Sequence, residues 1–272
     1  MDPSSSISMN QGTFVQANGL HMYYETHGTG TPVILLHGGT VNCQMWAPFL
    51  NLFSKDYQLI TPDSRAHGRT DNPTGAMSYR LMAEDIAQFI QALGLHRPFV
   101  GGYSDGGLTA LEMAMNYPGL TRGYMIGGIQ HTHNEAYFEL MRGILGMVSP
   151  GVVDFERLIQ TNSQLIPDLQ EQHDIFKTPG YWKTYLEQMS KQWMIPLTHT
   201  PADFAKITDP VLFFCGDRDA ANPPEQNLEM YRMVKGSELA VLLNADHWSI
   251  AQQFDLVVAM MDNFMKRVTK PV

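Results

Sequence analysis

A serine lies between glycines where the pattern of the chain changes from strand to helix. The stretch Gly102-Tyr103-Ser104-Asp105-Gly106 follows the apolar run PFVG and precedes the helical stretch LTALEMAMNY. A residue at so sharp a turn has a strained backbone and an exposed side chain, and the flanking glycines let neighbouring segments approach without Cβ clashes. We predict that Ser104 is a nucleophile over the N-terminus of the following helix. The alternative is a glycine-rich turn that only happens to contain a serine.

A serine hydroxyl is a weak nucleophile until a base takes its proton, and that base must itself be oriented by an acid. Asp219 follows the apolar run VLFFC, and His247 follows the last apolar run of the chain. The resulting order Ser, Asp, His is one that serine nucleophiles of strand-turn-helix type use. We predict Asp219 as the acid and His247 as the base. Asp217 is the competing acid, although a turn or capping role is commoner so near a strand end, and the alternative for His247 is a loop histidine packed on Trp248.

A glycine pair follows another apolar run, PVILL, in the segment Leu36-His37-Gly38-Gly39-Thr40. A tetrahedral oxyanion needs two hydrogen-bond donors that are already in place. We predict that these donors are the backbone amides of Asp105, directly after the nucleophile, and of Gly39. Gly38 is the less favoured donor, and we expect His37 to fix the loop rather than to react.

Short apolar runs separated by amphipathic stretches must position these residues. Such alternation predicts an α/β fold with a mainly parallel central sheet flanked by helices. The opening differs, because Asn18-Gly19 separates two alternating runs between Thr13 and Glu25 and therefore predicts an antiparallel hairpin. Buried strands are expected at 32–36, 57–62, 98–102, 123–127, 211–215 and 238–243, and helices at 79–93, 108–117 and 256–268.

The alternation breaks between about residues 131 and 200. This segment contains no strand-like run, is rich in methionine and aromatic residues, and is divided by Gly and Pro into short stretches. We predict a helical insertion, residues 131–200, in a core domain formed by residues 1–130 and 201–272. His131 and His133 lie near its start, but no third ligand is evident, so no metal site is expected.

Composition narrows the classes of protein that remain. The chain has 272 residues, of which 44% are hydrophobic and 17% charged, as in a globular protein with a sizeable core. A formal net charge of -9 without a Lys/Arg cluster argues against a nucleic-acid partner. The two cysteines, Cys43 and Cys215, are expected to be reduced.

The first residues, MDPSSSISMNQG, lack the basic start and the apolar stretch of a secretory signal. No later segment reaches the roughly 18 apolar residues that are needed to span a bilayer. We therefore expect a soluble, cytoplasmic protein without a membrane partner, present as a monomer or a homodimer.

These motifs together resemble the α/β-hydrolase superfamily over essentially the whole chain. The Gly-Tyr-Ser-Asp-Gly-Gly turn is similar to that of the valacyclovir-hydrolase-like esterases, and residues 63–70, DSRAHGRT, resemble the family's D-x-R-G-x-G-x-S loop. Ala66 stands where Gly is usual and Thr70 where Ser is usual. These departures bear on the subfamily rather than on the fold.

The resemblance implies an α/β-hydrolase fold in which residues 131–200 form a cap that covers the nucleophile and shapes the acyl pocket. The expected activity is that of a serine hydrolase that cleaves a small ester, lactone or related acyl substrate through a Ser104 acyl-enzyme, without a cofactor. A serine at this position argues against epoxide hydrolases and haloalkane dehalogenases of the same superfamily, which use Asp. An acyltransferase or perhydrolase with the same residues, and a small-molecule-binding receptor with a vestigial site, are the alternatives.

Overall fold

The computed structural model describes residues 12–53 and 55–270. The stretch from which the absence of a secretory signal was predicted lies almost entirely outside these residues. Within the described part of the chain, no helix is both long enough and apolar enough to cross a membrane.

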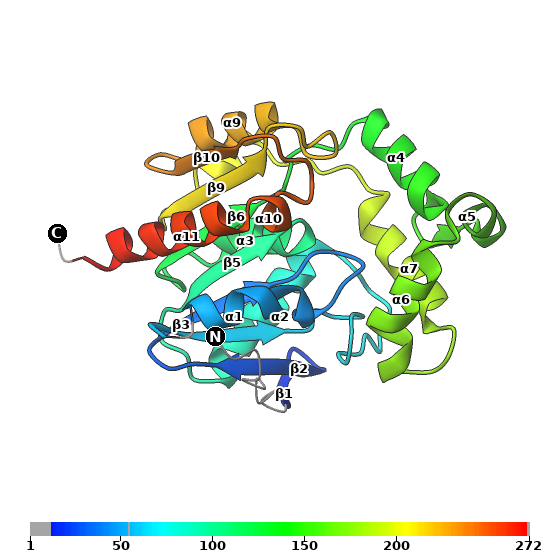
Figure 1. Cartoon of the computed structure of the whole chain (residues 1–272), viewed down its shortest axis with the longest axis horizontal. Helices are drawn as coiled ribbons and strands as arrows, with labels where there is room; N and C mark the ends of the chain where they lie inside the picture. Colours follow the sequence, from blue (N-terminus) through cyan, green and yellow to red (C-terminus); the bar gives the residue numbers. More distant parts are fainter. Residues whose placement is uncertain (1–11, 54, 271–272) are drawn as a thin grey trace, which may run out of the picture.

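A single eight-stranded sheet forms the centre of the molecule, in the order β1-β2-β4-β3-β5-β6-β9-β10 (Figure 1). β1 (Thr13–Ala17) and β2 (Leu20–His27) form the predicted antiparallel hairpin, and both residues of its Asn18-Gly19 turn have positive φ. β2 also pairs antiparallel with β4, whereas all remaining pairs in this sheet are parallel. The parallel strands are β3 (Thr31–Leu36), β4 (Tyr57–Pro62), β5 (Phe99–Tyr103), β6 (Gly123–Gly127), β9 (Val211–Gly216) and β10 (Glu238–Leu242). The predicted α/β architecture is confirmed.

The prediction of a fully buried last strand is wrong. β10 lies at the edge of the sheet, where it pairs with β9 alone. Val241 is 43% exposed and Leu243, just beyond the strand, is 72% exposed. An apolar run such as LAVLL indicates a strand, but it does not show whether the strand is central or at the edge, because both kinds of strand can be continuously apolar.

Helices cover both faces of the sheet. Successive side chains of a strand point to opposite faces, so Val33 and Leu35 of β3 pack with α1 and α11, whereas Ile34 and Leu36 pack with α2 and α3. The helices of the core are α1 (Ala47–Phe53), α2 (Tyr79–Ala92), α3 (Asp105–Asn116), α8 (Pro201–Phe204), α9 (Pro224–Met233), α10 (Ser249–Gln252) and α11 (Phe254–Thr269), with a 3-10 turn, η1 (Cys43–Trp46).

Residues 131–200, called the insert below, lie together beyond the ends to which the central strands point (Figure 1). The helical elements of the insert are α4 (Glu135–Leu145), α5 (Phe155–Asn162), α6 (Leu165–His173), η2 (Asp174–Phe176) and α7 (Tyr181–Trp193). The insert also contains a small antiparallel hairpin of β7 (Met147–Ser149) and β8 (Val152–Val153), which corrects the expectation that no strand occurs there. Strands of two and three residues are too short to produce a detectable alternation.

Candidate active site

Ser104 occupies the turn between β5 and α3 in a strained conformation, with φ of 55° and ψ of -119°. A positive φ is uncommon for a residue with a Cβ, and the surrounding packing must enforce it. Here the neighbours come very close: a Cβ on Gly106 would lie 2.2 Å from the carbonyl oxygen of Leu36, and one on Gly102 would lie 2.1 Å from that of Gly106. The glycines therefore allow β3, β5 and α3 to meet around a half-buried Ser104.

The three side chains predicted to react together are joined by hydrogen bonds. His247 Nε2 lies 3.1 Å from Ser104 Oγ, and His247 Nδ1 lies 2.9 Å from Asp219 Oδ2. Asp219 is 2% exposed. Because the Asp219 carboxylate can only accept, Nδ1 carries the imidazole proton and Nε2 presents its lone pair to the serine hydroxyl. His247 Nε2 is therefore close enough to Ser104 Oγ, and in the right tautomer, to accept the hydroxyl proton.

Two residues that the sequence did not single out lie against His247. The Tyr103 hydroxyl donates to the His247 carbonyl at 2.8 Å, and the Asn222 side-chain nitrogen lies 3.0 Å from His247 Nδ1, to which it cannot donate while that nitrogen carries the proton. The amides of Ala221 and Asn222 donate to Asp219 Oδ1 at 3.0 and 2.8 Å. This Asx-type turn, of which the only sequence signal is Asp219 itself, fixes the carboxylate that accepts His247 Nδ1.

Asp217, the competing acid, does not contact His247. Its Oδ1 accepts the amide of Ala245 at 3.0 Å, and this hydrogen bond is the main reason why the pKa of Asp217 lies below its usual range. The carboxylate therefore ties the end of β9 to the loop that carries the histidine. Of the two aspartates in this loop, only Asp219 is part of the hydrogen-bonded chain to Ser104.

The loop after β3 lies against Ser104. A Cβ on Gly38 would lie 3.4 Å from Ser104 Cβ, and the Gly38 amide donates to Met45 Sδ at 3.3 Å. Among the described residues, no acceptor is hydrogen-bonded to the amides of Gly39 or Asp105, and the Asp105 amide is one of those that a helix N-terminus leaves unpaired. These two amides can therefore donate to a developing negative charge.

His37 has a supporting position beneath this loop. Its Nδ1 lies 2.7 Å from the Gly38 carbonyl, and its Nε2 accepts the Ser64 amide at 3.0 Å. Burial lowers the pKa of His37, which keeps the ring neutral. Both ring nitrogens are thus used to hold the loop that contains Gly38 and Gly39.

The side chain of Asp105 is a further feature that the sequence did not reveal. Its carboxylate accepts the Tyr79 hydroxyl at 2.7 Å and is bonded through both oxygens to the Trp193 indole nitrogen at 2.9 Å. Burial raises the pKa of Asp105 to about 6, although these hydrogen bonds oppose the shift. Trp193 belongs to α7, so this contact joins the insert to the residue after Ser104.

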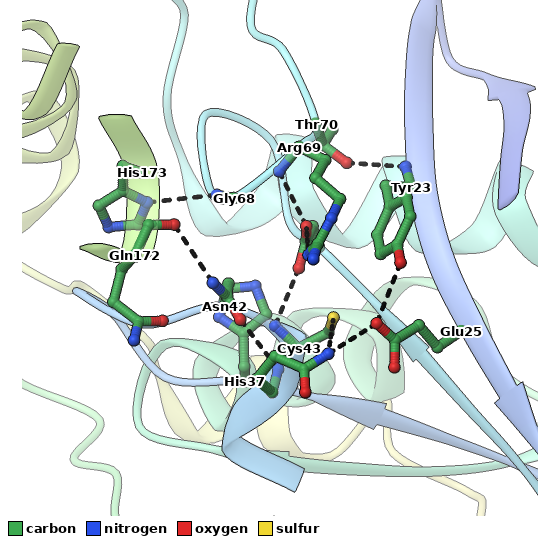
Figure 2. Close-up of polar contacts among 12 residues, drawn as sticks. Tyr23, Glu25, His37, Asn42, Cys43, Gly68, Arg69, Thr70, Gln172 and His173 are labelled. Carbon is green, nitrogen blue, oxygen red and sulfur yellow. Dashed lines mark hydrogen bonds and ion pairs between the residues drawn. The ribbon is translucent and has the colours of Figure 1, made fainter. Parts of the chain in front are cut away.

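The other end of the insert is fixed to the loop of residues 63–70. Figure 2 shows Gln172 and His173, at the end of α6, reaching Asn42 and Gly68 of the core, with hydrogen bonds of 3.2 Å in both cases. Lys177 Nζ donates to the Gly68 carbonyl at 2.8 Å. Several polar contacts therefore attach the insert to the core on this side.

The two unusual residues of the 63–70 loop have structural explanations. Ala66, where the related families have Gly, adopts φ of 67°, a left-handed conformation that glycine adopts without strain. Thr70 Oγ1 accepts the Tyr23 amide at 2.9 Å, a hydrogen bond that the usual serine would also make (Figure 2). Ala66 therefore adopts a backbone conformation that suits glycine, and the Thr70 hydroxyl makes a contact that serine could also make.

The remaining candidate groups have other partners. His131 Nε2 lies 2.8 Å from Glu229, and His133 Nδ1 lies 3.0 Å from the Ile195 carbonyl. Within residues 12–53 and 55–270, no group of three or more metal-ligating side chains occurs. Cys43 and Cys215 are both buried and are not joined in a disulfide.

Comparison with known proteins agrees with this architecture. The model of the alpha/beta hydrolase family matches residues 33–260, so the chain belongs to that family. The 2-hydroxy-6-oxo-2,4-heptadienoate hydrolase of Pseudomonas putida is 23% identical over 96% of this chain and 98% of its own length.

Solved structures resemble the chain over almost its whole length. A meta-cleavage product hydrolase from Pseudomonas fluorescens IP01 superimposes with a TM-score of 0.77 at 21% identity, over 95% of this chain and 98% of that one. An enol-lactonase from Burkholderia xenovorans LB400 gives a TM-score of 0.71 at 17% identity, over 93% and 99%. At such identities the likeness shows the fold. The finer resemblance to valacyclovir-hydrolase-like esterases stays a prediction.

Proposed function

We propose that the chain is a serine hydrolase that cleaves a small ester, lactone or related acyl compound through an acyl-enzyme on Ser104. The observation that carries this proposal is the hydrogen-bonded chain from Ser104 Oγ through His247 to the buried Asp219 carboxylate. Membership of a family of hydrolases supports it. The named relatives, a dienoate hydrolase and an enol-lactonase, both act on small molecules that contain carbonyl groups.

The reaction proceeds in two steps. His247 Nε2 accepts the hydroxyl proton as Ser104 Oγ attacks the carbonyl carbon, and the proton then passes to the leaving alcohol as its bond to carbon breaks. Water, deprotonated by His247, attacks the acyl-enzyme and releases the acid and the free serine. Asp219 stabilises the imidazolium in both steps, and the amides of Gly39 and Asp105 stabilise the oxyanion.

The insert has the role of a cap in this proposal. Trp193 and Tyr185 of α7 reach the loop that carries Gly39, and Trp193 also contacts Asp105. Side chains of the insert therefore lie within the surroundings of the reacting serine, where they are available to shape an acyl pocket. A serine, rather than an aspartate, at position 104 favours acyl transfer over the alkyl-ester chemistry of epoxide hydrolases.

Replacement of the nucleophile tests the proposal. Ser104→Ala is expected to lower the turnover of an activated ester such as p-nitrophenyl acetate by at least about a thousandfold, because the acyl-enzyme can no longer form. Ser237→Ala, which removes a serine hydroxyl from a distant surface turn, is the matched control and should leave turnover unchanged. Retained turnover in a folded Ser104→Ala protein would refute the assignment.

A substrate panel then defines the acyl class. Esters, lactones, thioesters, amides and a 2-hydroxy-6-oxo-dienoate are compared by kcat/KM, and added alcohol or peroxide reports transfer to acceptors other than water. The proposal predicts that hydrolysis of a small ester or lactone is the fastest of these reactions.

A further inference from the structure

We propose that the Asp105 carboxylate is a positioning residue: it fixes the Trp193 indole of α7 against Gly39 and thereby keeps the Gly39 amide in place as an oxyanion donor. This inference rests on the proposed function, since it concerns how the same site stabilises its oxyanion. It assigns to the insert a part in the chemistry beyond shaping a pocket.

The first observation is that protein donors occupy the Asp105 carboxylate. The Tyr79 hydroxyl and the Trp193 indole donate to it at 2.7 and 2.9 Å, and the Gln192 amide lies 3.5 Å away. Asp105 is only 5% exposed. A buried carboxylate is costly unless it is hydrogen-bonded, so removal of one donor leaves a charge that the remaining contacts do not compensate. The position of the Trp193 indole and the stability of the buried Asp105 carboxylate therefore depend on each other.

The second observation is the close packing at Gly39. A Cβ on Gly39 would lie 2.3 Å from Trp193 Cζ2 and 2.9 Å from Asp105 Oδ2. The indole and the carboxylate thus form the wall against which the Gly39 backbone rests. The Asp105 backbone amide is the other proposed oxyanion donor. Asp105 therefore sets the position of both donors: its own amide directly, and the Gly39 amide through Trp193.

The third observation is that the same loop is strained at its next residue. Thr40 has φ of 61°, which a β-branched residue rarely adopts unless its surroundings enforce it. Its amide donates at 2.7 Å to the hydroxyl of Tyr185, and that hydroxyl lies 3.1 Å from His67 Nε2. Tyr185 lies two turns before Trp193 on α7, so this helix contacts the loop at Gly39 through one residue and at Thr40 through the other.

Trp193→Phe tests the proposal, because it removes both the indole donor to Asp105 and the outer ring atoms, Cζ2 and Cη2, that lie against Gly39. We expect kcat on p-nitrophenyl acetate to fall by about tenfold to hundredfold, the order of loss that a misplaced catalytic group causes, while KM changes by less than about twofold. Inhibition by phenylboronic acid, which forms a tetrahedral adduct with a serine hydroxyl, should weaken in proportion to kcat/KM.

Lys191→Met is the matched control. Lys191 lies in the same turn of α7 and donates to the Gly75 carbonyl at 2.8 Å, but it does not reach the Gly39 loop. This variant should keep the kcat and the boronic acid affinity of the wild type. An equal loss in Lys191→Met would mean that α7 acts only as a general support, and the proposal would be wrong.

Other outcomes also decide the question. Unchanged kcat in Trp193→Phe, or a raised KM with unchanged kcat, would overturn the proposal and make Trp193 a pocket residue. If Trp193→Phe does not fold, Asp105→Leu takes its place, and the same loss of kcat is expected because a leucine side chain of similar size accepts no hydrogen bond from the indole. Absence of wild-type turnover, or full activity of Ser104→Ala, would instead contradict the proposed function.

Discussion

Asp217 and Asp219 lie in one loop after the same strand, yet their carboxylates have different partners. Asp217 accepts a backbone amide at Ala245, whereas Asp219 accepts His247 Nδ1 on one oxygen and two backbone amides on the other. Residue type alone cannot separate them. The direction in which each side chain leaves the turn decides which of them can orient the base.

Substitution of both aspartates tests this difference. Asp219→Asn should lower kcat by about 10⁴-fold, because an amide in place of the carboxylate no longer stabilises the imidazolium or enforces the required tautomer. Asp217→Asn should change kcat by less than about threefold, since it lies outside the hydrogen-bonded chain to Ser104. Steady-state kinetics with an activated ester measure kcat of both variants. A larger loss of kcat in Asp217→Asn than in Asp219→Asn would reverse the assignment of the acid.

The raised pKa of Asp105 predicts a pH dependence of stability. With a pKa of about 6 in the folded protein and about 4 in the unfolded chain, the folded state binds more protons between these values. The contribution of this group to the unfolding free energy is therefore largest below about pH 4 and falls by about 3 kcal/mol as the pH rises through 6.

Urea unfolding of the wild type and of Asp105→Asn at several pH values measures this contribution. The wild type should lose stability relative to the variant as the pH rises from 4 to 7. Asp217→Asn provides a comparison with the opposite sign, because the pKa of Asp217 is lowered rather than raised. A pH-independent difference between wild type and Asp105→Asn would show that burial of this carboxylate does not shift its pKa.

At the scale of elements, the turn between β5 and α3 depends on backbone contacts that only glycine permits. Gly106 approaches the carbonyl of Leu36 in β3, and Gly102 approaches the carbonyl of Gly106. These contacts place the first turn of α3, which contains the Asp105 amide, directly beside the loop that contains the Gly39 amide. The turn therefore sets the distance between nucleophile and donors as well as the strained φ of Ser104.

Gly106→Ala should therefore lower the unfolding free energy by about 3 kcal/mol, because the added methyl group meets backbone atoms that cannot move aside. Gly143→Ala is the control, because Gly143 is exposed within α4 and a Cβ added there would meet no described atom within 4 Å. The control should gain about 0.5 to 1 kcal/mol from helix propensity. Urea midpoints measure both, and equal midpoints would contradict the packing argument.

At the scale of the whole molecule, the sequence predicts the sheet well because its central strands are continuous apolar runs. The Asn18-Gly19 turn predicts the antiparallel start, and Ser104, Asp219 and His247 each follow a predicted strand. The carboxyl ends of parallel strands meet at one edge of a sheet, so three residues that each follow such a strand lie at the same edge.

The features that the sequence did not predict depend on contacts between distant segments. Trp193 meets Asp105 across 88 positions, and Asn222 meets His247 across 25. No local pattern encodes such pairs. Two further features were missed for local reasons. The sequence of β10 reads like that of a central strand although β10 lies at the edge of the sheet, and the strands β7 and β8 are too short to show an alternating pattern.

Covalent labelling is the sharpest test of whether Ser104 is the reacting group. A fluorophosphonate probe is added to the protein, and mass spectrometry of the intact chain and of its peptides locates the adduct. We expect one adduct per chain, on Ser104, and we expect labelling to be strongly slowed in His247→Ala because the base is lost. An unlabelled Ser104, or an adduct at another residue with Ser104 free, would contradict it.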